Sequence, residues 1–158
     1  MRHATALSHK RTQKEGAPES NFKGRKPMHE PRLGRKTLKV LVLDDCQDVL
    51  LLYGDLLRHE RVEILASKAV NSVDEAMALV RLIKPDIVIS DLCLTMGHTE
   101  GFEILAKMRE EMPFVPVALS SCSYPNDENI VPEIEKKGFD ALFNKGDVKG
   151  ISEFISRF

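Results

Sequence analysis

Six polar side chains directly follow short apolar segments of the chain: Asp44, Asp45, Asp91, Ser120, Ser121 and Lys145. Three carboxylates held within a few ångströms of one another repel unless a cation joins them, and an all-oxygen site with open water positions suits Mg²⁺. A carboxylate nucleophile, a divalent cation, a hydroxyl and a lysine are the parts needed to form and stabilise an aspartyl phosphate. The residue types therefore indicate phosphoryl chemistry, provided that the fold brings them together.

The segments that must position these side chains alternate between two patterns. Short runs rich in β-branched residues predict strands at residues 39–43, 62–66, 86–90, 115–119 and 140–143. The longer stretches between them have the helical period, which favours an α/β fold with a parallel sheet covered on both faces.

Five helices are expected in the gaps. The first covers residues 47–59, with Val49, Leu52, Tyr53 and Leu56 as its apolar stripe. The second opens with a capping box at Ser72 and Glu75 and ends before Pro85. The third follows Gly101, the fourth covers 127–137 and ends at Gly138, and the last covers 148–157.

An open parallel sheet binds ligands beyond the carboxyl ends of its strands, at the point where the strand order reverses. In the order 2-1-3-4-5 the first and third strands are neighbours, so Asp44, Asp45 and Asp91 converge. Ser121 and Lys145 then flank the same crevice.

Four motifs carry a resemblance to a known family: V-L-V-L-D-D, P-D-I-V-I-S-D-L, P-V-A-L-S-S and G-F-D-A-L-F-N-K. In order and spacing they resemble the receiver domain of two-component response regulators over residues 37–158. The resemblance implies a flavodoxin-like (βα)5 fold, a three-layer sandwich. It also implies that Asp91 is the phosphoacceptor and that Mg²⁺ is bound by Asp44, Asp45, Asp91 and the backbone carbonyl of Cys93.

The same resemblance implies that Ser121 and Lys145 bind the phosphoryl oxygens. A histidine kinase or a histidine phosphotransfer protein is then the expected phosphoryl donor, and the cytoplasm the expected compartment. We expect no output domain after residue 158, so the signal would pass through protein contacts on the face formed by the fourth helix, the fifth strand and the fifth helix. Two alternatives stay open: a degenerate receiver that acts only as a docking module, and a small Mg²⁺-dependent phosphohydrolase.

Several positions depart from the family pattern. The loop after Asp91 is two residues longer than usual and contains His98, Gly146 replaces a common proline, and Leu142 replaces a switch aromatic. The residues expected to orient the hydrolytic water are Cys93 and Ser123. A thiol is a weak hydrogen-bonding group and a serine is short, so we expect slow self-catalysed loss of phosphate.

Charge divides the chain into two parts. Residues 1–36 hold ten Lys and Arg against three Glu, a net charge of +7, whereas the whole chain has a net charge of -1. We expect residues 1–36 to be a disordered basic arm preceding the receiver domain at 37–158. A solvated tail is the favoured interpretation; contact with nucleic acid, an anionic membrane or an acidic protein is the alternative.

Composition and motifs exclude several other classes. The apolar runs are far shorter than the roughly 20 residues of a membrane span. The three cysteines have no C-x-x-C spacing, which argues against zinc ribbons and disulfide scaffolds. The sequence has neither G-x-G-x-x-G nor G-x-x-x-x-G-K, so dinucleotide-binding and P-loop classes are also excluded.

Overall fold

Strands and helices alternate along the part of the chain that the structure describes, which comprises residues 36–59, 61–66, 68–95, 99–122, 124 and 128–158 of a computed structural model. The strands are β1 (Leu38–Leu43), β2 (Val62–Leu65), β3 (Ile87–Ser90), β4 (Val117–Ser121) and β5 (Ala141–Asn144). The helices are α1 (Gln47–Leu56), α2 (Val73–Ile83), α3 (Glu100–Glu111), α4 (Val131–Lys136) and α5 (Val148–Ile155). The strands form one parallel sheet in the order β2-β1-β3-β4-β5, which confirms the predicted fold class and strand order.

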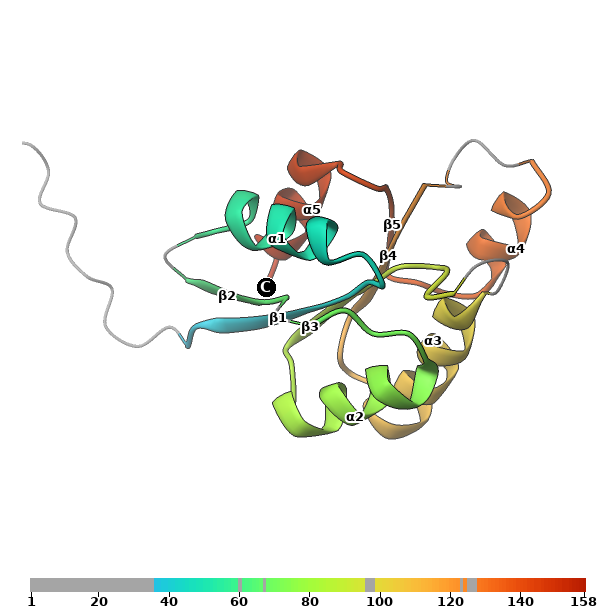
Figure 1. Cartoon of the computed structure of the whole chain (residues 1–158), viewed down its shortest axis with the longest axis horizontal. Helices are drawn as coiled ribbons and strands as arrows, with labels where there is room; N and C mark the ends of the chain where they lie inside the picture. The colour runs from blue at the N-terminus through green and yellow to red at the C-terminus, as the bar shows by residue number, and fades with distance from the viewer. Residues whose placement is uncertain (1–35, 60, 67, 96–98, 123, 125–127) are drawn as a thin grey trace, which may run out of the picture. The chain divides into compact units, whose positions relative to one another are not determined.

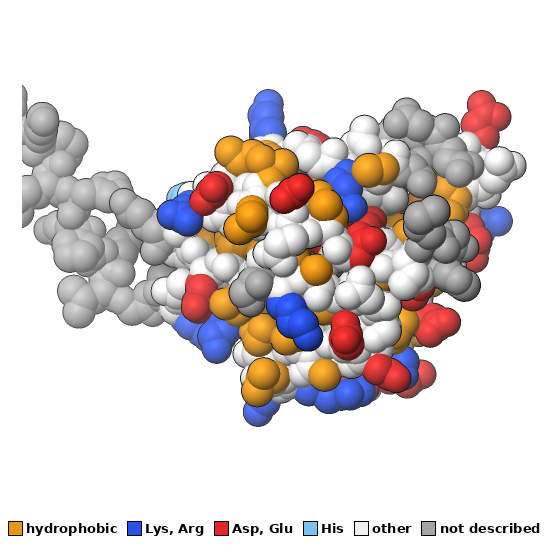
Figure 2. Space-filling view, viewed as in Figure 1, with side chains coloured by type: hydrophobic (Ala, Val, Ile, Leu, Met, Phe, Trp, Pro, Cys, Tyr) orange, Lys and Arg blue, Asp and Glu red, His pale blue; other side chains and the backbone are white. Residues whose placement is uncertain are grey.

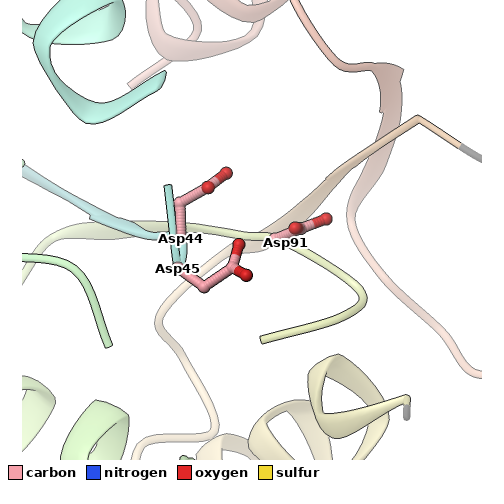
Figure 3. A group of neighbouring side chains, drawn as sticks. All are labelled: Asp44, Asp45 and Asp91. Carbon is pink, nitrogen blue, oxygen red and sulfur yellow. The ribbon is translucent and has the colours of Figure 1, made fainter. Parts of the chain in front are cut away.

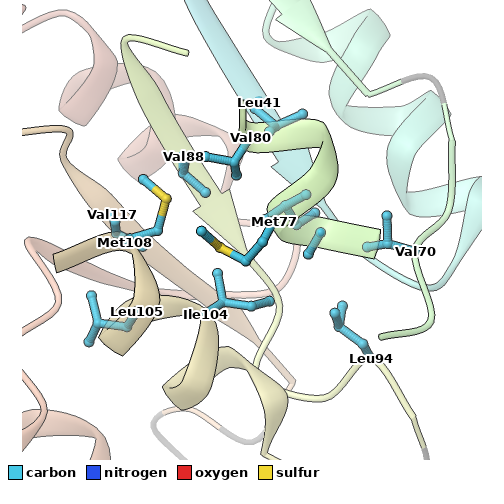
Figure 4. Packing of buried hydrophobic residues seen from close by; sticks show 12 residues of the cluster. Leu41, Val70, Met77, Val80, Val88, Leu94, Ile104, Leu105, Met108 and Val117 are labelled. Carbon is cyan, nitrogen blue, oxygen red and sulfur yellow. The ribbon is translucent and has the colours of Figure 1, made fainter. Parts of the chain in front are cut away.

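Two layers of helices cover the sheet, α1 and α5 on one face and α2 and α3 on the other (Figure 1). Successive strand residues point to opposite faces. Val40 and Val42 accordingly pack with α1 and α5, whereas Leu41 and Leu43 pack with α2 and α3. The second of these cores is shown in Figure 4. Because both faces of the central strands are buried, residues 40–43 of β1 and 87–89 of β3 are continuous apolar runs rather than alternating ones.

Helix α2 begins and ends where the sequence predicts. The Ser72 hydroxyl accepts a hydrogen bond from Glu75 N at 3.2 Å, and the Glu75 carboxylate accepts one from Asn71 N at 3.1 Å. At the other end Lys84 adopts the left-handed conformation, with φ of +52°, immediately before Pro85. A non-glycine residue in this conformation is strained, and the strain gives a stability prediction.

We expect Lys84→Gly to raise the free energy of unfolding by about 0.5–1 kcal/mol. Glycine removes a left-handed penalty of roughly 1–2 kcal/mol and adds a smaller entropic cost. The exposed α2 residue Ala78 provides a control, because Ala78→Gly should lower stability by about 1 kcal/mol. Urea unfolding midpoints measure both, and two shifts of the same sign would contradict the assignment of strain to Lys84.

Strand β4 lies two residues further along the chain than the predicted 115–119. Ser120 and Ser121 are its last two residues rather than the loop after it. The strand was predicted to end where the apolar side chains end. Ser120 is nevertheless tolerated in the buried sheet because its hydroxyl is hydrogen-bonded to Tyr53.

The predicted apolar stripe of α1 is partly wrong. Leu52 and Leu56 are 45% and 52% exposed, and the buried side chains are those of Leu50, Tyr53 and Leu57. Apolar side chains accordingly lie at the surface over α1 (Figure 2). Leucines at three consecutive positions, 50–52, leave the helical phase ambiguous by about one residue.

The helix ends also differ from prediction in places. Helix α1 ends at Leu56 rather than at residue 59. Helix α4 begins at Val131, with Pro132 in its first turn, where proline is favoured because its missing N–H has no helical partner. The predicted start at Asp127 lies outside the described residues. Gly138 follows α4 with φ of +83°, as expected of a residue that ends a helix.

Two further expectations concern membrane spans and the basic arm. Among the described residues no helix has the length and apolar character needed to cross a bilayer. Residues 1–36 are expected to be disordered, but all of them except Lys36 lie outside the described residues.

Candidate functional site

Three carboxylates gather at the carboxyl ends of β1 and β3. Leu43 is the register partner of Ser90, and Asp91 N donates to Leu43 O at 2.8 Å, so the residues that follow the two strands lie side by side. Carboxylate oxygens of Asp44, Asp45 and Asp91 lie within 4.8 Å of one another (Figure 3). Asp44 and Asp91 are 2% and 7% exposed, whereas Asp45 is open to solvent.

Backbone amides fix one oxygen of each buried carboxylate. Asp44 Oδ1 accepts from Cys46 N at 2.9 Å, in the turn that leads into α1. Asp91 Oδ1 accepts from Leu92 N at 2.7 Å. The local chain thereby orients both side chains before any ligand binds.

Lys145 joins the two buried carboxylates from the end of β5. Its Nζ lies 2.9 Å from Asp44 Oδ2 and 2.8 Å from Asp91 Oδ2. Burial disfavours the charged ammonium, but the hydrogen bonds and negative charges of the two carboxylates outweigh this effect and raise the pKa of Lys145. Burial raises the pKa of Asp91, although Lys145 opposes that shift.

Ser121 and Cys93 occupy the edges of the same region. Ser121 is buried at the end of β4, between β3 and β5, and its carbonyl accepts from Lys145 N at 3.1 Å. Cys93 is partly buried in the loop after Asp91, and burial together with the Asp91 charge raises the pKa of its thiol. His98 and Ser123 lie outside the described residues.

Gly101, whose role could not be inferred from the sequence, lets α3 approach the loop that follows β3 at Asp91 and Leu92. Its amide donates to Leu92 O at 2.9 Å. A Cβ at this position would lie 2.6 Å from Asp91 O and 2.9 Å from Leu92 Cα, closer than real contacts allow. The one signal in the sequence is a glycine at the start of a predicted helix.

The carboxylate group fits a hard divalent cation. All three side chains offer oxygen ligands, which Mg²⁺ prefers, and exposed Asp45 leaves the site open to water. One lysine against three carboxylates leaves the group net negative. This donor set agrees with the Mg²⁺ predicted from the sequence.

The sequence of the chain matches a known protein family. The family model described as the response regulator receiver domain matches residues 40–153. The chain belongs to this family. The three carboxylates and Lys145 all lie within the matched residues.

Individual relatives of this receiver domain are distant. The nitrogen assimilation regulatory protein NtrX of Azorhizobium caulinodans is 27% identical over 103 residues, which are 65% of this chain and 22% of NtrX. The chain thus spans about a fifth of the length of the curated relative it matches.

Two solved structures show the same fold. The phosphorylated cyanobacterial phytochrome response regulator RcpA is 20% identical, with a TM-score of 0.57 over 76% of this chain and 89% of RcpA. The Mn²⁺-bound form of response regulator Rcp1 is 17% identical, with a TM-score of 0.55 over 75% of this chain and 92% of Rcp1.

Proposed function

We propose that this receiver domain is a phosphorylation-dependent signalling module in which Asp91 accepts a phosphoryl group from a histidine kinase or a histidine phosphotransfer protein. The observation that carries the proposal is the meeting of two buried carboxylates, a third exposed one and a partly buried lysine at one edge of the sheet. A structural ion pair between Lys145 and the two buried carboxylates would not need the exposed Asp45 beside them.

In the proposed transfer, an oxygen of Asp91 forms a bond to phosphorus while the bond between phosphorus and the donor imidazole nitrogen breaks. The electron pair stays on that nitrogen, which takes up a proton. Leu92 N orients the Asp91 carboxylate for this attack. Asp44, Asp45, Asp91 and the Cys93 carbonyl would hold Mg²⁺, which would supply positive charge to offset the charge on the phosphoryl oxygens.

Ser121 and Lys145 are proposed to hold the phosphoryl oxygens. Lys145 supplies a partly buried positive charge 2.8 Å from Asp91 Oδ2, where the phosphoryl group would be attached. Its backbone bond to Ser121 O keeps the ends of β4 and β5 together. Both residues are therefore placed to respond to a new charge on Asp91.

The proposed output is protein contact on the face of α4, β5 and α5, in the cytoplasm, and the docking partner is unknown. Residues 37–158 would form the receiver domain and residues 1–36 a basic arm, for which nucleic-acid contact is not the favoured role. The phosphorylated state of RcpA and the Mn²⁺ in Rcp1 support the assignment by similarity of fold.

One observation favours the docking alternative. Leu142 packs in an apolar cluster with Leu92 and Ile134, where the family's switch aromatic was expected. A leucine cannot report phosphorylation by the turning of a ring. A module that only docks would leave Asp91 unmodified.

Incubation with acetyl phosphate, followed by intact-mass measurement with Mg²⁺ and with a chelator, tests the proposal. We expect one phosphoryl group per chain with Mg²⁺ and none with the chelator. No addition under either condition would favour docking, and continued turnover of a generic phosphate ester would favour a phosphohydrolase.

Lys145→Ala is expected to retain some phosphate addition but to lose most of the amide chemical-shift changes at the ends of β4 and β5. The lysine is the charge that links Asp91 to the β5 loop, residues 145–147 between β5 and α5. Lys149→Ala is the control, because the Lys149 side chain is 88% exposed on α5 and pairs with Glu153 rather than with Asp44 or Asp91. Shift changes of equal size in Lys145→Ala and the unmodified sequence would disprove the coupling.

Self-catalysed loss of phosphate is proposed to be slow, because neither the Cys93 thiol nor the Ser123 hydroxyl orients water well. Cys93→Asn combined with Ser123→Glu should shorten the lifetime about 10-fold, equivalent to about 1.4 kcal/mol of barrier. Decay of the phosphorylated mass over time measures the lifetime. If the phosphorylated, unsubstituted protein has a lifetime of seconds and the double substitution does not change it, other groups position the water.

A further inference from the structure

Tyr53 carries a buried hydroxyl inside an otherwise apolar core. Its side chain, on the sheet-facing side of α1, is only 1% exposed and packs in the cluster that contains Ala118 and Phe154. The hydroxyl lies 2.7 Å from Ser120 Oγ, and it accepts a hydrogen bond from Gly146 N at 3.0 Å. An apolar residue would fill the same space, so the polar pairing needs its own explanation.

Both partners of the Tyr53 hydroxyl are sequence neighbours of the proposed phosphoryl-binding residues. Ser120 precedes Ser121, and Gly146 follows Lys145. The end of β4 and the β5 loop are also joined directly, by the 3.1 Å hydrogen bond from Lys145 N to Ser121 O. Together with the two contacts of the Tyr53 hydroxyl, this bond makes a closed ring of contacts between α1, the end of β4 and the β5 loop. One hydroxyl thus holds two chain segments that meet at the site.

The β5 loop needs such support because Gly146 has φ of +91° and no side chain to anchor it. The peptide N–H of Gly146 points to the hydroxyl, a bond that a proline at this position could not donate. The segment that carries Lys145 is therefore positioned by a contact with α1 rather than by a rigid residue of its own.

We propose that Tyr53 is a positioning residue for phosphorylation. Its hydroxyl holds the β5 loop against the end of β4, and this contact positions the Lys145 ammonium and Ser121 to bind the phosphoryl oxygens. This inference rests on the proposed function of Asp91. Tyr53 itself acts only through Ser120 and Gly146, since its hydroxyl is bonded to these two groups.

Tyr53→Phe removes the hydroxyl and keeps the ring. We expect the initial rate of phosphate addition from acetyl phosphate to fall about 10-fold, and hydrogen exchange of the Gly146 amide to accelerate about 10-fold. Affinity for Mg²⁺ alone should stay within about twofold or increase, because a looser Lys145 competes less for Asp44 and Asp91.

The control is Val80→Ala, a buried substitution in α2 on the other face of the sheet, which lowers stability without touching the ring of contacts. A general loss of structure reduces phosphate addition and Mg²⁺ affinity together, whereas the positioning role separates them. Ser120→Ala, which keeps the Tyr53 bond to Gly146, should slow addition by only about two- to threefold. It also gives a readout if Tyr53→Phe does not fold.

An unchanged rate in Tyr53→Phe, or a parallel fall of rate and Mg²⁺ affinity as in Val80→Ala, would overturn the proposal. If the unsubstituted chain takes up no phosphate, the proposed function of Asp91 fails. In that case exchange of the Gly146 amide still decides whether Tyr53 holds the loop: acceleration supports the positioning contact, and an unchanged rate rejects it.

Discussion

Asp91→Asn should abolish the addition of phosphate from acetyl phosphate while leaving the fold intact. The amide is isosteric with the carboxylate and can still accept from Leu92 N, but it is not a nucleophile toward phosphorus. It also removes one of the three carboxylates that attract Mg²⁺. The intact mass after incubation should equal that of untreated protein.

Asp86→Asn is the matched control for this substitution. Asp86 precedes β3 as Asp91 follows it, so the two aspartates stand at opposite ends of one strand. Asp86 accepts from Lys39 N at 2.9 Å and pairs with Lys36, with no contact to the acidic group. Its amide variant should label at the original rate, and undiminished labelling of Asp91→Asn would move the phosphoacceptor to another residue.

Gly101→Ala is expected to have the second-largest effect, a loss of both stability and the rate of phosphate addition. The added Cβ would overlap the backbone of Asp91 and Leu92, so α3 or the loop after β3 must shift. Overpacking of this kind costs about 1–3 kcal/mol of stability. A displaced Asp91 should also slow phosphate addition by about 10-fold or more, since reactive geometry is sensitive to shifts of about 1 Å.

Gly54→Ala supplies the comparison, because Gly54 lies in α1 and a Cβ added there would meet nothing within 4 Å. Replacing a helical glycine with alanine should raise stability by about 0.5–1 kcal/mol and leave labelling unchanged. Urea unfolding and the labelling rate are measured on both variants. Equal labelling rates in Gly101→Ala and Gly54→Ala would show that the close approach of α3 does not position Asp91.

The sequence was sufficient for the architecture and for the acidic group. β-branched runs separated by helical periods predict a parallel α/β sheet, and the polar residues at the strand ends locate its functional edge. Asp44 and Asp91 converge because β1 and β3 are neighbours, a relation that follows from the strand order. Lys145 reaches the same pair from β5.

The details that depend on side-chain packing could not be predicted. The predicted strand stops before Ser120, because the Tyr53 hydroxyl that satisfies this buried serine comes from a helix 67 residues away in the sequence. The buried side of α1 depends on which of several leucines meets the sheet. The role of Gly101 depends on how closely α3 approaches the Asp91 loop, a distance that local sequence does not encode.

The most direct test of the central claim identifies the residue that carries phosphate. Protein treated with acetyl phosphate and Mg²⁺ is reduced with borohydride, which converts an acyl phosphate to an alcohol, and the peptides are then sequenced by mass spectrometry. We expect the reduced aspartate to be Asp91 and a chelator to prevent its formation, as the assignment of Asp91 requires. Modification at Asp44, Asp45 or a histidine instead, or no modified aspartate, would contradict it.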